Sequence, residues 1–129
     1  MIAHVQTVDG LAVVDLDEET LVELDASRSL EQRAAPATSL PRVIAAAAGG
    51  STVVAVVDTR PPLVVSHDAG QTWRDSGRGL PAGVAIAVSA ENPDVLLYAT
   101  RNRLHLSRDG GRFWQSLGLE LPEILAVEL

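Results

Sequence analysis

The chain has no cysteine, no lysine and few aromatic side chains: one Phe, one Tyr and two Trp among 129 residues. Without cysteine there can be no disulfide, no thiolate nucleophile and no Cys-ligated zinc or iron–sulfur cluster. Without lysine there is no Schiff-base or general-base lysine. No apolar run reaches the ~18 residues of a membrane span, and the start Met-Ile-Ala-His lacks the basic residues of a signal peptide. We therefore expect a cytoplasmic protein with no membrane partner.

Positive charge is also in short supply. Ten arginines stand against seventeen acidic residues, giving a net charge of -7 and a pI near 4.8. Phosphate backbones need a positive field, so we expect no nucleic-acid partner. The acidic excess lies in residues 1–40, and it either marks a docking surface for a basic partner or aids solubility. The apolar content of 47% is enough for one domain with a hydrophobic core.

A segment of eight residues occurs twice, 41 positions apart. Ser66-His67-Asp68-Ala69-Gly70-Gln71-Thr72-Trp73 recurs as Ser107-Arg108-Asp109-Gly110-Gly111-Arg112-Phe113-Trp114. A Leu-Pro pair keeps nearly the same spacing at 40–41, 80–81 and 121–122, and an apolar, alanine-containing run follows each pair. The sequence therefore predicts repeating units of about 41 residues.

Each complete unit is predicted to contain four short strands. The strands are expected at 43–48, 52–57, 63–66 and 72–75, and then at 84–89, 95–100, 104–107 and 113–117. Gly, Pro, Asn and Asp lie between these runs, which is the pattern of β-hairpins. The inner strands are apolar at successive positions, which is typical of a sheet with both faces buried.

The repeated segment resembles the Asp-box, or bacterial neuraminidase repeat, with the pattern Ser-x-Asp-x-Gly-x-Thr-Trp. The first copy has all five residues of this pattern, and the second has Phe113 in place of threonine. The chain thus resembles the Asp-box β-propeller families, which include sialidases, sortilin-type receptors and photosystem II assembly factor-like propellers. The resemblance covers residues 41–122 well and residues 1–40 weakly. A four-stranded unit of this length is also the size of one propeller blade.

The box residues have a structural interpretation. An aspartate in a tight turn accepts backbone N–H groups, glycine supplies a positive φ, and tryptophan packs against a neighbouring blade. The resemblance implies the same structural role, on the face opposite the substrate site, rather than catalytic or metal-binding carboxylates. These structural residues are Ser66, Asp68, Gly70, Thr72, Trp73, Ser107, Asp109, Gly111 and Trp114.

Residues 1–40 lack a complete box but fit a blade that is short of one strand. Strands are expected at 3–8, 11–16 and 20–24, and the segment 123–129 is expected to supply the missing one. The chain is therefore divided into three blades: 1–40 with 123–129, then 41–81, then 82–122. An alternative for the segment 25–35 is a short helix, capped by Ser27 or Ser29 and ended by Pro36.

Three blades do not close a ring, because propellers usually have about four to eight. The open blade faces would expose apolar area of the kind that marks an interface. The sequence thus predicts an all-β fold with three four-stranded blades per chain, completing a six-bladed β-propeller as a homodimer. In that prediction, the C-terminal strand of one chain completes the first blade of the other, as in a domain swap.

Candidate ligand-binding residues lie in the turns between second and third strands and in the connections between blades, which share one face of a propeller. Guanidinium groups there suit an anionic or carboxylate ligand, and the alternative is that they are ordinary solvated turn residues. The candidates are Asp9, Asp58, Arg60, Arg78, Arg101, Asn102 and Arg103. They favour a non-catalytic binding or assembly module that presents a funnel and loop face to a protein or small ligand.

The alternative function is a sialidase-like glycoside hydrolase or a sugar-binding propeller. The sialidase resemblance implies an arginine triad, a tyrosine nucleophile paired with a glutamate, and an aspartate acid/base. The single tyrosine, Tyr98, lies in an apolar run that favours packing, and Leu40-Pro41-Arg42 does not match the Arg-Ile-Pro motif of sialidase blades. A glycosidase needs two convergent carboxylates, and no spacing supports Asp9 with Asp58. Both tryptophans belong to the boxes, which argues against sugar stacking.

No metal or cofactor is expected. His4, His67 and His105 lack the spacing of metal ligands and are assigned structural or solvent-exposed roles. The acidic run 15–19 lacks the glycine and the final glutamate of a calcium-binding loop.

Overall fold

The computed structural model describes residues 1–30, 36, 40 and 42–129. Within that part of the chain, the regular structure consists of strands joined by turns. The strands are β1 (Ile2–Thr7), β2 (Gly10–Asp15), β3 (Thr20–Asp25), β4 (Val43–Gly49), β5 (Thr52–Val57), β6 (Leu63–Ser66), β7 (Arg74–Ser76), β8 (Ala85–Val88), β9 (Leu96–Ala99), β10 (Arg103–Ser107), β11 (Gln115–Glu120) and β12 (Ile124–Glu128). The described residues include no helix long and apolar enough to cross a membrane.

The strands form three four-stranded antiparallel sheets. Sheet 1 has the order β12-β1-β2-β3, sheet 2 has β4-β5-β6-β7, and sheet 3 has β8-β9-β10-β11. Apart from β12, each sheet is built from strands consecutive in sequence, because hairpin turns join them directly. The all-β class and the four-stranded units predicted from the sequence are confirmed, and the sheets are consistent with propeller-like blades.

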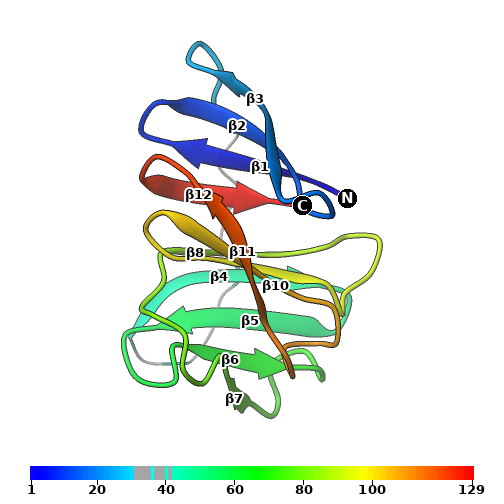
Figure 1. The fold of residues 1–129 in the computed structure, drawn as a ribbon. Coiled ribbons are helices and arrows are strands. Elements are labelled where there is room, and N and C mark those ends of the chain that lie inside the picture. The colour runs from blue at the N-terminus through cyan, green and yellow to red at the C-terminus, as the bar shows by residue number, and fades with distance from the viewer. Residues whose placement is uncertain (31–35, 37–39, 41) are drawn as a thin grey trace.

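Sheet 3 lies between the other two sheets. Its inner strand β8 packs against β4 and β5 of sheet 2 on one side and against β12 of sheet 1 on the other. Figure 1 shows sheets 1 and 2 extending in opposite directions from this centre, upward to β3 and downward to β7. The inner strands therefore gather at the centre, and sheets 1 and 2 each keep one face turned away from sheet 3.

Two apolar cores hold the sheets together. The core between sheets 1 and 3 includes Val5, Val14, Leu97, Leu104 and Leu106. The core between sheets 2 and 3 includes Val54, Val56, Leu63, Leu96 and Tyr98. Successive residues of a strand point to opposite faces, so Leu96 and Leu97 serve different cores. This explains why β9 is apolar at every position.

The C-terminal strand closes sheet 1 within its own chain, which differs from the predicted exchange between two chains. β12 pairs with β1, and Val127 lies opposite Val5. The physical reason is the length of the connection from β3 to β4, residues 26–42. Seventeen residues reach roughly 55 Å when extended, so sheet 1 can dock beside sheet 3 although the chain continues into sheet 2.

The outermost strands begin later than predicted. β7 begins at Arg74 rather than Thr72, because the Asp68 carboxylate accepts hydrogen bonds from the backbone N–H and hydroxyl of Thr72 and keeps that residue in the turn. β11 likewise begins at Gln115, since Asp109 accepts the N–H of Phe113. For the alternative helix at 25–35, residues 25–30 are the end of β3 and a turn region, and residues 31–35 lie outside the described residues.

Candidate functional site: the loop face

Three turns and two connections form one end of the molecule, called the loop face below. The turns join β1 to β2, β5 to β6, and β9 to β10, and the connections join β7 to β8 and β11 to β12. Backbone hydrogen bonds tie them together: the N–H of Val8 donates to the carbonyl of Glu123, and the N–H of Ile124 to that of Arg101. The turns predicted to share a face therefore do meet around the ends of the inner strands.

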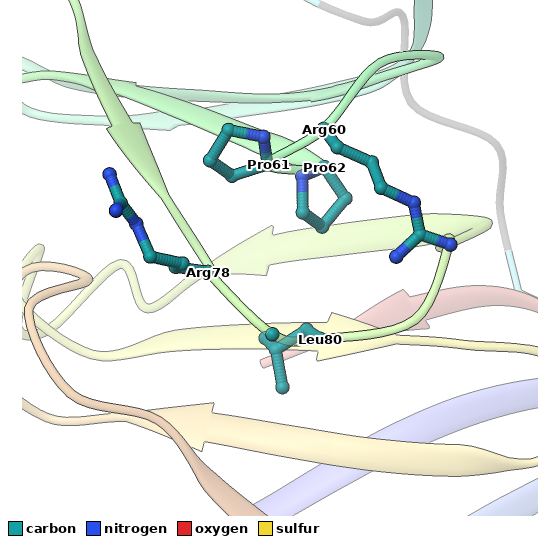
Figure 2. A pocket seen from close by; sticks show the side chains of 6 residues that line it. Arg60, Pro61, Pro62, Arg78 and Leu80 are labelled. Carbon is teal, nitrogen blue, oxygen red and sulfur yellow. The ribbon is translucent and has the colours of Figure 1, made fainter.

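A shallow hollow of about 330 Å³ lies on the loop face between the β5–β6 turn and the β7–β8 connection. Its floor is apolar, and an arginine stands on either side (Figure 2). The two guanidinium groups point away from each other, so they do not form a convergent oxyanion site. No ion pair to either arginine exists among the described residues. The lining residues are Arg60, Pro61, Pro62, Arg78, Gly79 and Leu80.

Tyr98 is fully buried in sheet 3. Its hydroxyl donates a hydrogen bond to the carbonyl of Pro81 at 2.6 Å. Burial raises the pKa of Tyr98 to about 12, and the nearby positive charge of Arg60 opposes this rise. A tyrosine nucleophile needs an accessible oxygen and a lowered pKa, so this geometry favours the packing role.

A second shallow hollow, of about 570 Å³, lies beside the inner strand of sheet 1. Val84, Arg101, Glu123, Ile124 and Leu125 line it. The Arg101 Nε donates to the Glu123 carboxylate at 3.0 Å, with the side chains 78% and 43% exposed. A pair this exposed contributes little stability, but it offsets the charge that Arg101 would offer to an anionic ligand.

The other candidates are dispersed over the loop face. Asn102 uses its amide to donate to the carbonyl of Leu121 at 2.9 Å, so it joins the turn to the connection. Asp9, Asp58 and Arg103 are exposed. The structure therefore brings only Arg60 and Arg78 of the predicted set to one hollow.

The apolar floor of the first hollow was missed by reasoning from the sequence. Pro61 and Pro62 lie in a turn, where prolines usually indicate the end of a strand and are not expected to form a binding surface. The signal that could have identified them is a proline pair directly after Arg60, in a turn expected on the same face as the connection that carries Arg78 and Leu80.

The box residues form hairpin turns at the other end of β6 and β10. The Asp68 carboxylate accepts hydrogen bonds from the Ser66 hydroxyl and from the Thr72 hydroxyl and N–H. The Asp109 carboxylate accepts from the Ser107 hydroxyl and from the N–H groups of Arg112 and Phe113. Gly70 and Gly111 have φ of +89° and +92°, a region that side chains with a Cβ resist.

The Asp68 turn is expected to lose stability in acid. Its hydrogen bonds, chiefly those from Thr72 and then that from Ser66, lower the pKa of Asp68 from 3.8 to about 2. As the pH falls, the unfolded chain therefore takes up a proton at this group before the folded chain does. The contribution of Asp68 to the free energy of unfolding is thus present above pH 3.8 and is lost as the pH falls towards about 2. Urea unfolding of wild type and Asp68→Asn should show a gap at about pH 5 that closes at about pH 2. A gap that does not change with pH would contradict this role.

Trp114 connects sheet 3 to sheet 2. Its indole N–H lies 3.0 Å from the Ser76 hydroxyl and 3.2 Å from the carbonyl of Gly111. Its ring meets Tyr98 edge-on, with centroids 6.0 Å apart. The side chain therefore packs against the neighbouring sheet and also holds a polar contact across the boundary.

His105 is a buried member of sheet 3. Its ring nitrogens lie 2.7 Å from the Ser116 hydroxyl and 3.4 Å from the Thr100 hydroxyl. Burial, with a smaller contribution from Arg103, lowers its pKa. Within residues 1–30, 36, 40 and 42–129, no cluster of three or more His, Asp or Glu side chains is arranged to hold a metal ion.

Comparison with known proteins adds a likeness in fold. No family model matches the sequence, and no curated protein matches it either. A solved structure described as the GH74 enzyme of Niastella koreensis has 20% identity to this chain and a TM-score of 0.51. The match covers 97% of this chain and 19% of that one, so the chain spans about a fifth of the enzyme's length. The likeness supports a propeller-type fold and carries no function with it.

Proposed function

We propose that this chain is a non-catalytic binding module whose first hollow takes an acidic segment of a partner protein. The observation that carries the proposal is an apolar floor of Pro61, Pro62 and Leu80 with Arg60 and Arg78 on opposite sides. A small oxyanion would need donors that converge on one point. Separated guanidinium groups instead suit an extended peptide with an apolar centre and an acidic residue on each flank.

The state of the carboxyl groups supports binding over catalysis. The carboxyl groups of Asp17, Asp25, Asp68 and Asp109 all have lowered pKa values, because they accept hydrogen bonds. A glycosidase general acid needs a raised pKa beside a second carboxylate. The buried hydroxyl of Tyr98 and the Arg101–Glu123 pair likewise leave the catalytic roles of a sialidase without matching groups.

The module works as half of a ring in this proposal. The three sheets of one chain would form three blades, and a second copy of the chain would supply three more to complete a six-bladed propeller. Each copy keeps its own β12, as the structure has it, so the exchange expected from the sequence is not needed for closure. The ring would carry the first hollow twice, once in each copy, on the same face. This arrangement suits a partner with two binding segments.

Binding of a peptide probe tests this function. The probe is a fluorescent, roughly ten-residue peptide with a Leu-Pro centre and glutamate flanks, compared with the same peptide carrying lysine flanks. We expect the acidic peptide alone to bind, and Arg60→Ala with Arg78→Ala to weaken it about tenfold or more. Arg112→Ala, an exposed arginine in the opposite turn, is the matched control. Equal binding of both peptides, or no binding of either, would contradict the proposal.

Glycoside hydrolase activity is the second candidate, because a matching solved structure is described as an enzyme. Incubation with chromogenic sialosides and a panel of other chromogenic glycosides distinguishes it from binding alone. Turnover by the purified wild-type chain would favour this candidate and overturn the non-catalytic assignment.

A further inference from the structure

One contact between sheets 2 and 3 is made by a tryptophan whose counterpart in the repeat makes no such contact in the described part of the chain. In sheet 3, Trp114 reaches across to sheet 2, where its indole N–H donates to the hydroxyl of Ser76 at 3.0 Å. Trp73 occupies the same box position in sheet 2, 41 residues earlier. Its side chain is partly exposed, and its indole N–H has no hydrogen-bond partner among the described residues. Trp73 therefore lies on the side of sheet 2 where the described residues form no further sheet for it to contact.

The face of sheet 2 that carries this position is apolar. Val54, Val56 and Leu63 point into the core with sheet 3, so the alternate residues of these strands point the other way. Strand register places the alternate residues side by side: Ala46 opposite Ala55, and Ala55 opposite Val64. By the 41-residue repeat, Ala55 corresponds to Leu96, whose face of sheet 3 is covered by sheet 2. Ala55 itself is fully buried within the chain, while its neighbours Ala46 and Val64 are partly exposed. This outward face of sheet 2 thus corresponds to a face that sheet 2 covers in sheet 3.

Sheet 1 presents the matching acceptor. Ser76 is paired with Leu63, at the start of the third strand of sheet 2. In sheet 1, the residue paired with Leu11 at the start of the corresponding strand is Asp25. Ala12 and Val14 point into the core with sheet 3, so Leu11 and its partner belong to the face turned away from sheet 3. Asp25 therefore holds the register position of Ser76 on the outward face of sheet 1, where Leu11 is buried within its own chain and the Leu30 N–H donates to Gln6 Oε1 at 2.9 Å.

Among the described residues, the hydrogen bonds to the Asp25 carboxylate use only one of its two oxygens as acceptor. Its Oδ1 accepts the N–H of Ser27 at 2.9 Å and the Ser27 hydroxyl at 2.6 Å. No hydrogen bond to Oδ2 is made by the described residues. A carboxylate oxygen is a stronger acceptor for an indole N–H than the serine hydroxyl it replaces.

From this correspondence we infer that a second copy of the chain docks its sheet 2 on the outward face of sheet 1, with Trp73 of one copy donating to Asp25 of the other. The contact is made twice in the two-fold dimer, and it continues the boundary already seen between sheets 2 and 3. The inference rests on the proposed half-ring, and it specifies which side chains join the halves.

Analytical ultracentrifugation of single variants tests the contact. Trp73→Phe keeps an aromatic ring but removes the N–H, and Asp25→Ala removes the acceptor. Each change is expected to raise the dimer dissociation constant by about tenfold or more, since each removes two hydrogen bonds to a charged group. Asp25→Ser, which installs the group that Ser76 supplies, is expected to restore much of the affinity. Asp94→Ala, an exposed carboxylate in another turn, is the matched control.

Mixing the two weakened variants provides a second readout that monomer destabilisation cannot imitate. Each variant alone lacks both contacts, whereas the mixed dimer has one intact contact, made by Asp25 of the Trp73→Phe chain and Trp73 of the Asp25→Ala chain. The mixture is therefore expected to associate more tightly than either variant by itself. A wild-type chain that sediments as a monomer would overturn the half-ring. A wild-type dimer with unchanged variants, or a mixture with no gain in affinity, would overturn the contact and leave the half-ring standing.

Discussion

Replacing Gly83 with alanine is expected to destabilise the fold strongly, although the change adds only one methyl group. A Cβ at this position would lie 2.0 Å from Cε1 of Tyr98 and 2.3 Å from its hydroxyl oxygen. The Tyr98 ring is fully buried and cannot swing into solvent. Overpacking costs about 1–3 kcal/mol or more, and displacing the ring also breaks its hydrogen bond to Pro81, which adds about 1 kcal/mol. The total is therefore expected to be roughly 3 kcal/mol.

Urea unfolding followed by circular dichroism measures this loss, with Gly118→Ala as the control. A Cβ on Gly118 would meet no atom within 4 Å, so that variant is expected to stay within about 0.5 kcal/mol of wild type. Both proteins are compared at one concentration, because dimer formation would couple to stability. A Gly83→Ala protein as stable as the control would contradict the packing described for Tyr98.

Trp114→Ala is expected to cause a loss of similar size by separating sheet 3 from sheet 2. The substitution removes the indole from the core between these sheets and deletes its edge-on contact with Tyr98. It also leaves the Ser76 hydroxyl without its indole donor. Removing a tryptophan from a core costs about 3–5 kcal/mol, and the partial exposure of this side chain favours the lower end.

The adjacent residue supplies the control for this prediction. Phe113 is 79% exposed, so Phe113→Ala is expected to change the free energy of unfolding by less than about 0.5 kcal/mol. Trp114→Phe isolates the polar part, because it keeps most of the apolar area and loses only the N–H, at about 1 kcal/mol. Equal effects of Trp114→Ala and Phe113→Ala in thermal unfolding would contradict the assigned position of Trp114.

Much of the fold could be predicted from the sequence because the information is local and repeated. The strands of sheets 2 and 3 follow from apolar runs between turn residues, and the predicted bounds of β5 and β6 match those observed. The 41-residue repeat then gives the units without any knowledge of packing. Where the prediction missed, at the start of β7, the cause is a side chain: Asp68 competes with the strand for the N–H of Thr72.

The pairing of β12 and the make-up of the site could not be predicted in this way. Whether β12 joins its own β1 or that of another copy depends on the reach of the connection 26–42, which strand periodicity does not record. The hollow depends on where the Arg60 and Arg78 side chains point, and turn chemistry does not fix rotamers in solvent. Sequence reasoning therefore placed these arginines on the correct face, while their divergent directions emerged only from the structure.

The molar mass of the wild-type chain in solution shows whether two copies join to complete the ring. Size-exclusion chromatography with light scattering, run over a range of concentrations, is the measurement. A half-ring completed by a second copy predicts twice the 13.6 kDa mass of one chain, persisting on dilution into the micromolar range. A single species of 13.6 kDa at every concentration would show that the outward faces of sheets 1 and 2 need no second copy, and would contradict the half-ring.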